Sequence, residues 1–311
     1  MNFKKINKGI FGGSIILLIM INLFNALNYF FHFVMARMLE PKDYGILAAL
    51  MSLLYIFNVP SESIQTIIAK YTSQESSLGK IKNLIKRSLN KGFKISIILF
   101  LLYLLIAIFL SKFLNINYFL LALTGLLMIM VFLMPINRGT LQGRKKFRAL
   151  GFNMIFESII KIVLSILLVY FGLKVYGAMA GVVVGSFCAF FFSFFSLKDI
   201  FSSEEKTTET KEIYRYSVPV FVVVFTIMTV YSLDVILAKA FFSEQIAGQY
   251  AIASVLSKII FFGTLPISKV MFPISSEASK NKKHSKGIFY KSLLALGFCI
   301  GIALLVMAFF P

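Results

Sequence analysis

The sequence contains no tryptophan, and only two cysteines and two histidines among its 311 residues. Cys188 and Cys299 both lie within apolar runs without the spacing of a metal site, so we interpret them as small buried hydrophobic residues. His32 and His284 are equally isolated, and they form no metal-binding pattern with other residues. We therefore expect no metal and no other cofactor.

Charged residues are also scarce, at 14% of the chain, whereas hydrophobic residues make up 59%. Soluble globular domains contain about 25% charged and about 45–50% apolar residues. The composition therefore excludes an ordinary soluble protein and predicts a membrane protein.

A net charge of +19 could indicate nucleic-acid binding. However, the basic residues lie in short loops between apolar runs, with no aromatic platform beside them, and nucleic acid is not an expected partner.

Nine apolar runs are long enough to cross the hydrocarbon core of a bilayer, which requires about 20 residues. The first run has no convincing small-residue cleavage site after it, so we expect a retained spanning helix rather than a signal peptide. These runs predict an all-α, polytopic bundle of about nine transmembrane helices. The expected spans are approximately 11–35, 45–69, 95–113, 118–136, 150–172, 177–197, 216–238, 250–273 and 287–310.

Basic residues are distributed unevenly between alternate loops, because one set of loops holds 24 Lys and Arg and the other set holds five. By the positive-inside rule the richer set is cytoplasmic and the N-terminus is inside. We therefore expect a multi-pass protein of the plasma membrane that contacts membrane lipids. The predicted cytoplasmic loops are 1–8, 70–94, 137–148, 198–215 and 274–291, and the predicted outer loops are 36–44, 111–117, 172–177 and 239–249.

A polar turn followed by an apolar helix, residues 36–60, has a weaker second copy at an offset of 206 residues. Such repeats can relate two halves of a transporter by an axis along the membrane normal. We expect a six-helix half at 1–197, a mobile cytoplasmic linker at 198–215 and a second half at 216–311. Only three helices of that second half are present, so we expect a truncated chain, with a natural short form as the alternative. The identical pairs are Tyr44 and Tyr250, Ile46 and Ile252, Leu50 and Leu256, and Pro60 and Pro266.

No pattern of catalytic residues is evident, and we predict that the protein is not an enzyme. The predicted outer loops are six to eleven residues long, too short for an acceptor-binding domain. Paired carboxylates, a Ser/His/Asp set and a Walker glycine loop are absent from the sequence. Ionisable residues within the apolar runs are the remaining candidates, because each costs about 2.5–3.5 kcal/mol at the centre of a spanning helix.

Two lysines are the first candidates for binding an anionic substrate. Glu157 and Lys161 share one face of the fifth predicted helix. They form either a self-neutralising pair or a site in which Lys161 is a cationic contact in a central cavity. Lys258 lies near the middle of the eighth predicted helix with no acidic residue one turn away, so it must pair across helices or face water. Lys269 is nearer the cytoplasmic end and could simply extend its charge to the interface.

Further candidates lie near the ends of predicted helices. Glu62 follows a proline that loosens the backbone, and it could satisfy a freed amide, pair with a lysine or contact substrate. Asp234 corresponds to His32 at an offset of 202, and both could merely reach the outer interface. Arg37 and Lys239 occupy corresponding outer turns, where lipid headgroups or nearby acidic residues could bind them.

Two motifs resemble a known family. Ala36-Arg37-x-Leu39-x-Pro41-x-Asp43-Tyr44-Gly45 follows the first predicted helix, and Arg138-Gly139-Thr140-Leu141-Gln142-Gly143-x-x-x-Phe147 lies in the predicted cytoplasmic loop before the fifth. Together they resemble the polysaccharide-biosynthesis branch of the multidrug/oligosaccharidyl-lipid/polysaccharide (MOP) exporter superfamily, the Wzx-type flippases. The resemblance implies two helix bundles around a central cleft. It also implies alternating access that carries a saccharide linked to polyprenyl phosphate or pyrophosphate from the inner to the outer leaflet.

Such flippases usually have twelve or more spanning helices, whereas nine are expected here. Lys161 and Lys258, from different halves, would supply a cationic path for the lipid-linked oligosaccharide, and glycan-assembly enzymes are further expected partners. Three alternatives stay open: a cation-coupled multidrug exporter, a saccharide-polymerising membrane enzyme and a non-transporting scaffold of a glycan-assembly complex. The exporter would need central carboxylates, and the enzyme would normally have a long outer loop with Arg or His.

Overall fold

The computed structural model describes residues 3–207 and 217–258, with six further positions between residues 290 and 301. These residues form helices and turns without a strand, which confirms the all-α prediction. The chain divides into two compact units, residues 1–252 and 253–311, and each is considered by itself. The predicted halves at 1–197 and 216–311 stay a prediction.

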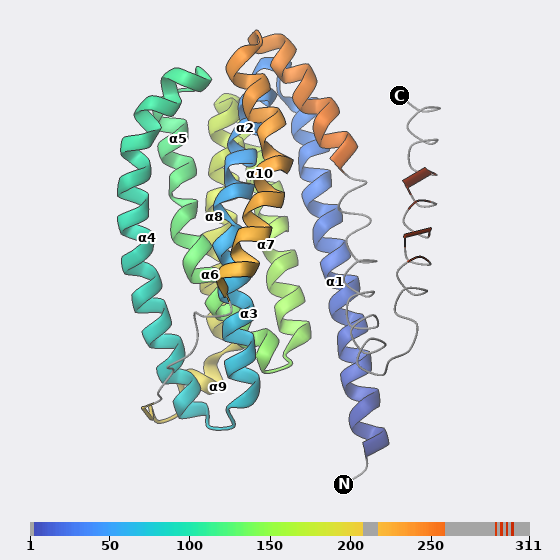
Figure 1. Cartoon of the computed structure of the whole chain (residues 1–311), viewed down its shortest axis with the longest axis vertical. Helices are drawn as coiled ribbons and strands as arrows, with labels where there is room; N and C mark the ends of the chain where they lie inside the picture. Colours follow the sequence, from blue (N-terminus) through green and yellow to red (C-terminus); the bar gives the residue numbers. More distant parts are fainter. Residues whose placement is uncertain are drawn as a thin grey trace. The chain divides into compact units, whose positions relative to one another are not determined.

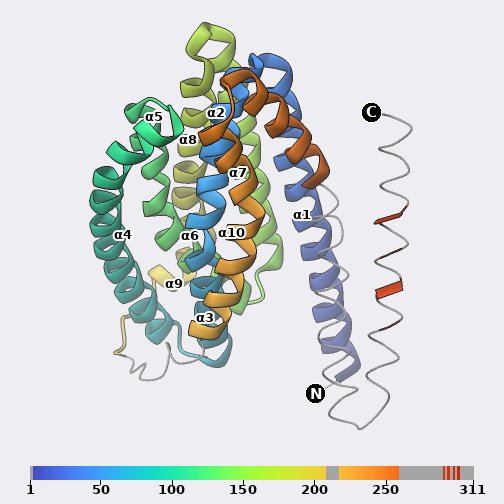
Figure 2. The same ribbon diagram turned by 45° about the horizontal axis from the view of Figure 1, so that its top comes forward.

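The long helices of the first unit run side by side as a bundle (Figure 1). In both views α4 lies on one side of this bundle and α1 on the other, with α2, α7, α8 and α10 between them (Figure 2). A further helical stretch covers residues 244–258. The elements are α1 (Phe3–Met38), α2 (Pro41–Phe57), α3 (Val59–Gln74), α4 (Leu78–Leu114), α5 (Tyr118–Gly125), α6 (Leu127–Gly143), α7 (Phe147–Leu168), the π-helix η1 (Val169–Leu173), α8 (Lys174–Ser196), α9 (Lys198–Phe201) and α10 (Ser217–Phe241).

Five helical stretches of the described chain are long and apolar enough to cross a membrane. The last of them, Phe147–Ser196, reverses direction at Gly172, so it contains the two predicted spans 150–172 and 177–197. Gly172 has a φ of 87°, a left-handed conformation that glycine adopts without steric cost. The other four stretches are Ile19–Met38, Pro41–Gln74, Leu78–Leu114 and Tyr118–Gly143.

Two predicted loops are largely helical in the structure. The predicted loop 70–94 contains the end of α3 and the first 17 residues of α4, so only a short turn separates these helices. The predicted loop 137–148 contains the end of α6, which continues to Gly143, and the start of α7 at Phe147. Both predictions of a loop were wrong because a basic residue ends an apolar run without ending the helix that carries it.

Side-chain contacts show which turns lie together at each end of the helix bundle. Lys174 pairs with Asp43 at 3.5 Å, and the Asn115 side-chain amide donates to Glu244 at 2.9 Å, so the predicted outer loops meet at one end. At the other end, Lys146 pairs with Asp199 at 2.7 Å and joins two predicted cytoplasmic loops. The structure therefore separates the two sets of loops as their charges predict.

The described part of the predicted linker, residues 198–207, lies against the first turns of α4, and we call it the α9 segment. Lys82 donates to the Ser203 carbonyl at 2.7 Å, and Lys86 pairs with Glu205 at 2.6 Å. Hydrogen bonds from Lys86 and Asn83 lower the pKa of the Glu205 carboxyl below its usual value. The α9 segment is thus bound to the bundle by several contacts.

At the opposite end, the N-terminus of α2 touches the helical stretch 244–258 through glycine. A Cβ added to Gly45 would lie 2.9 Å from the Cα of Gly248, and one added to Gly248 would lie 1.9 Å from the Pro41 carbonyl oxygen. The two backbones are therefore in direct contact, and these residues belong to the two copies of the repeated turn.

Candidate functional site

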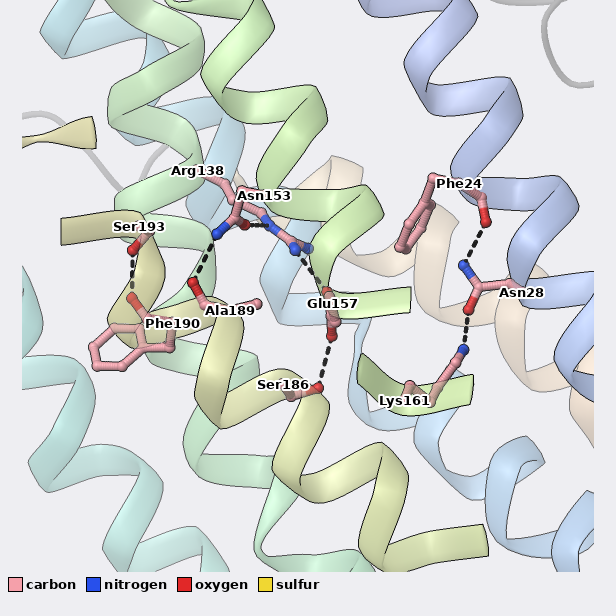
Figure 3. A network of polar contacts seen from close by, with 10 residues as sticks. All are labelled: Phe24, Asn28, Arg138, Asn153, Glu157, Lys161, Ser186, Ala189, Phe190 and Ser193. Carbon is pink, nitrogen blue, oxygen red and sulfur yellow. Dashed lines mark hydrogen bonds and ion pairs between the residues drawn. The ribbon is translucent and has the colours of Figure 1, made fainter. Parts of the chain in front are cut away.

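The candidate site is built on α7, which carries Glu157 and Lys161 one turn apart. Neighbouring helices supply their partners: Arg138 comes from α6, Ser186 from α8 and Asn28 from α1 (Figure 3). The two charged groups of α7 point toward different neighbours in this view. The site therefore has two parts, one between α6, α7 and α8 and the other between α1 and α7.

In the first part, Glu157 forms a closed ion pair with Arg138. The Arg138 Nη2 lies 2.6 Å from one carboxylate oxygen, and the Ser186 hydroxyl donates to the other oxygen at 2.7 Å. The Arg138 Nε donates to the Asn153 side chain at 2.8 Å, and the Asn153 amide donates to the Ala189 carbonyl at 2.7 Å. Both carboxylate oxygens are thus satisfied, and the negative charge of Glu157 is neutralised by Arg138.

In the second part, Lys161 has neutral partners. Its side chain is 6% exposed, and its ammonium donates to the side-chain oxygen of Asn28. The same ammonium lies 4.7 Å from the centre of the Phe31 ring, within cation–π range. The Asn28 amide is itself fixed by a 2.8 Å hydrogen bond to the Phe24 carbonyl. Glu157 and Lys161 therefore form no direct ion pair and interact only at longer range, while the Lys161 ammonium contacts an amide and an aromatic ring.

Glycine residues of α8 bring α7 close enough to form this arrangement. Gly177, Gly181 and Gly185 recur every four residues, so they line one side of α8. A Cβ at Gly181 would lie 2.6 Å from the backbone nitrogen of Ser165, and one at Gly185 would lie 3.1 Å from that of Lys161. Small residues at this spacing allow two spanning helices to approach backbone to backbone. The α7–α8 contact is accordingly the most extensive between helices of the described chain.

A second glycine pair holds the helix that carries Arg138. Gly139 and Gly143 of α6 face α3, where a Cβ on Gly139 would lie 2.6 Å from the Gln65 carbonyl oxygen. The Gln65 side chain also donates to the Gln142 side chain at 2.9 Å. The sequence motif that suggested a family is thus a helix-packing element, with Arg138 at its start directed toward α7 (Figure 3).

The remaining predicted site residues lie apart from this cluster. Glu62 is exposed in the first turn of α3. Arg37 is exposed near the end of α1, with its guanidinium 5.3 Å from the Phe33 ring centre. The hydroxyl of Tyr250 donates to Asp234 at 3.4 Å.

Two predicted lysines fall in the second unit. Lys258 is half-buried at the described end of the 244–258 helix and takes part in an interaction of its own, whereas Lys269 lies outside the described residues. His32, the counterpart of Asp234, does not reach the outer interface but is buried in α1 beside Tyr44, whose hydroxyl lies 3.3 Å from the His32 Nδ1. Lys239, at its outer turn, is buried and pairs with Glu244 at 3.9 Å. Of its two predicted partners, lipid headgroups and nearby acidic residues, the structure shows an acidic residue.

Sequence reasoning missed Arg138, Asn28, Asn153 and Ser186 as members of the site. Arg138 was assigned to a loop because it follows an apolar run, although the four-residue spacing of Gly139 and Gly143 is a helical signal. The uncharged residues gave no signal, because a single Asn or Ser in an apolar run is common. Among the described residues, no group of three or more His, Cys, Asp and Glu could hold a metal ion.

Comparisons with known proteins give a family and a fold. A family model described as "Polysaccharide biosynthesis protein" matches residues 34–310. One similar solved structure is the inward-facing conformation of a multidrug resistance MATE family transporter of the MOP superfamily. It is 14% identical with a TM-score of 0.67, and the match covers 91% of this chain and 68% of that one. A MATE crystal structure in complex with Br-NRF is 18% identical with a TM-score of 0.55, over 97% of this chain and 76% of that one. No curated protein matches the sequence. At these identities the two structures establish the fold alone.

Proposed function

The chain belongs to the polysaccharide biosynthesis protein family, and from this membership and the transporter fold we propose that it flips a lipid-linked oligosaccharide across the plasma membrane. The substrate is a saccharide on polyprenyl phosphate or pyrophosphate, and transport proceeds by alternating access. The N-terminus and the end of the bundle with the α9 segment face the cytoplasm, as the basic loops favour.

This orientation can be tested by cysteine accessibility. Cysteines placed at Lys42 and Lys146 should react with impermeant reagents from opposite sides, and reaction from the same side would contradict this orientation.

The observation that carries the proposal is the environment of Lys161. Its ammonium lies within a bundle of spanning helices, yet its contacts are the Asn28 amide and the Phe31 ring. A charge in a low-dielectric environment is stabilised far more by an anion than by a neutral amide. A phosphate that displaced Asn28 would therefore gain a strong interaction, whereas at Arg138 it would compete with Glu157. Lys258 and Lys269 are proposed as further contacts along the path.

Transport of a fluorescent undecaprenyl-pyrophosphate saccharide by reconstituted protein tests this proposal. Lys161→Met should reduce the rate at least tenfold, whereas Lys161→Arg should keep a measurable rate because the charge is retained. Lys112→Met, at an exposed position near the end of α4, is the matched control and should transport normally. Transport by Lys161→Met at the rate of the control would contradict the cationic role of Lys161, and wild-type protein without transport would contradict the proposed function.

The multidrug-exporter alternative depends on Glu157, the partly buried acid of the site. A coupling carboxylate has to exchange a proton or sodium ion, but both oxygens of Glu157 are bound by Arg138 and Ser186. The geometry therefore favours the saccharide substrate. Efflux of a cationic dye that is lost in Glu157→Gln, without any saccharide transport, would support the exporter instead.

A further inference from the structure

Ser158 of α7 has a buried hydroxyl that forms no hydrogen bond with the described part of the chain. The residue is 1% exposed and lies one helical turn before Lys161. Hydroxyls within helices commonly donate to a carbonyl three or four residues earlier. Thr124 and Thr140 do so here, each at 2.8 Å. A buried hydroxyl without a partner costs free energy, so Ser158 is suited to a partner that the chain itself does not supply.

Helical geometry places this hydroxyl on the side of α7 that faces α1. A Cβ added to Gly151 would lie 2.6 Å from the Cβ of Met20 in α1, so Gly151 marks that side. Ser158 follows Gly151 by seven residues, which are about two turns of an α-helix, and it therefore lies on the same side. Glu157, by contrast, is bound between α6 and α8 (Figure 3).

The Lys161 side chain extends over the same part of α7. Side chains of an α-helix point back toward its N-terminus, over the preceding turn. For Lys161 that turn holds Glu157 and Ser158, and its ammonium contacts Asn28 and Phe31 of α1. Lys161 therefore extends along the side that carries Ser158, and an ammonium and a hydroxyl lie near each other between α7 and α1.

We propose that Ser158 is a substrate-contact residue that binds, together with Lys161, the phosphate of the lipid-linked oligosaccharide. The inference rests on the proposed function and adds a second donor for the same anion. A phosphate has several acceptor oxygens, so it accepts from an ammonium and from a hydroxyl at the same time. Ser165, one turn beyond Lys161, already donates its hydroxyl to the Ala178 carbonyl at 2.9 Å and is not part of this pair.

This pair of donors selects for negative charge. A cation is repelled by the Lys161 ammonium, and a neutral ligand gains only ordinary hydrogen bonds. An anion gains a charge-assisted hydrogen bond from each donor, and such bonds are about twice as strong as neutral ones. The exchange requires that the Asn28 side chain leaves Lys161.

Binding of undecaprenyl phosphate to the purified full chain, measured by native mass spectrometry, tests this role. Undecaprenol has the same lipid chain without the phosphate, so it measures the contribution of the tail. The wild type should bind the phosphate form more tightly. Ser158→Ala should weaken binding of that form about tenfold and leave undecaprenol binding unchanged. Lys161→Met should remove most of the preference, and adding Ser158→Ala to it should change little more, because both residues bind the same anion.

Two comparisons separate the hydroxyl from the packing of α7. Ser158→Thr and Ser158→Val introduce side chains of the same shape, and only Thr keeps the hydroxyl. The Thr variant should bind undecaprenyl phosphate more tightly than the Val variant, by about tenfold. Ser165→Ala removes a hydroxyl that is already bonded, and it should keep the wild-type preference. Equal binding by the Thr and Val variants, or an equal loss in Ser165→Ala, overturns the role of Ser158.

The same measurement distinguishes this inference from the proposed function. If the wild type prefers the phosphate form and Ser158→Ala keeps that preference, the role of Ser158 is wrong while the proposed function stands. If the wild type binds undecaprenyl phosphate and undecaprenol equally, the proposed function is contradicted as well.

Discussion

The contact of α7 with α8 and the contact of α7 with α1 differ in what brings the helices together. Along α8, glycines at every fourth position bring the two backbones into contact, and Glu157 beside this interface accepts from Ser186 of α8 and pairs with Arg138 of α6. Along α1, side chains make the contact, and the buried charge of Lys161 has an amide and a ring as partners. The same helix thus has one interface held by backbone contact beside a closed ion pair and one interface at which a buried charge has neutral contacts.

This difference separates two roles for buried cations. Removing one member of a closed ion pair leaves a charge without compensation, so Arg138 and Glu157 stabilise the fold only together. A lysine with a neutral partner contributes little to folding and keeps its charge available for an anionic ligand. Variants of the two interfaces should therefore separate stability from transport, and the four predictions below run from the largest expected loss of stability to the smallest.

Glu157→Leu should have the largest effect, a loss approaching about 3–5 kcal/mol, because it leaves the partly buried Arg138 guanidinium without a carboxylate. Thermal unfolding in detergent, followed by circular dichroism, measures this. Adding Arg138→Met to Glu157→Leu should recover most of the loss, since both charges are then absent. Glu62→Leu is the control at an exposed acid and should change little. A stable Glu157→Leu protein would contradict the closed ion pair.

Gly181→Leu should lower stability by about 1–3 kcal/mol or more, because the larger side chain forces α7 and α8 apart. Even a Cβ at this position would lie 2.2 Å from the Ser165 hydroxyl oxygen. Val184→Leu, on an exposed face of α8, is the matched control and should unfold at the wild-type temperature. Equal stability of the two variants would show that the helices are not held by glycine contact.

Ser186→Ala should cost about 0.5–1.5 kcal/mol, because the Glu157 carboxylate loses one hydrogen bond but keeps Arg138. Ser158→Ala is the control on α7 itself, where a buried hydroxyl has no hydrogen-bond partner among the described residues. That variant should be neutral or slightly stabilising. The same unfolding measurement distinguishes the two, and an equal loss in both would remove Ser186 from the network.

Lys161→Met should have the smallest effect on folding, within about 1 kcal/mol, because a side chain of similar length replaces a buried charge without leaving an unpaired partner charge. Its transport, by contrast, should be lost. If this variant unfolds as readily as Glu157→Leu, Lys161 is a structural residue and the distinction between the two interfaces fails.

Much of the fold could be predicted from the sequence because apolar runs report directly on burial in lipid. The predicted span 11–35 lies within α1, and the predicted span 177–197 corresponds closely to α8. Helical ends were predicted less well, since α4 and α6 both extend beyond their apolar runs into basic segments. In α4, the buried Ile81, Leu84 and Ile85 already show helical spacing in the sequence.

The candidate site could be predicted only in part. Glu157 and Lys161 stand out because charge within an apolar run is rare. Their partners could not be predicted, because Lys161 and Asn28 are 133 residues apart and Asn28 has no distinctive local pattern. Whether Glu157 pairs with Arg138 or with Lys161 depends on how the helices pack. That packing follows from the spacing of glycines on two different helices, α6 and α8.

The contact between Gly45 and Gly248 joins the two copies of the repeated turn. At this point the two helices touch backbone to backbone, so no side chain lies between Gly45 and Gly248. The surrounding contacts at this end are polar and partly solvent-exposed, such as Lys174 with Asp43 and Asn115 with Glu244. Such contacts exchange readily with water. The two copies of the repeated turn are therefore joined at this end by one backbone contact and by polar contacts that each contribute little to stability.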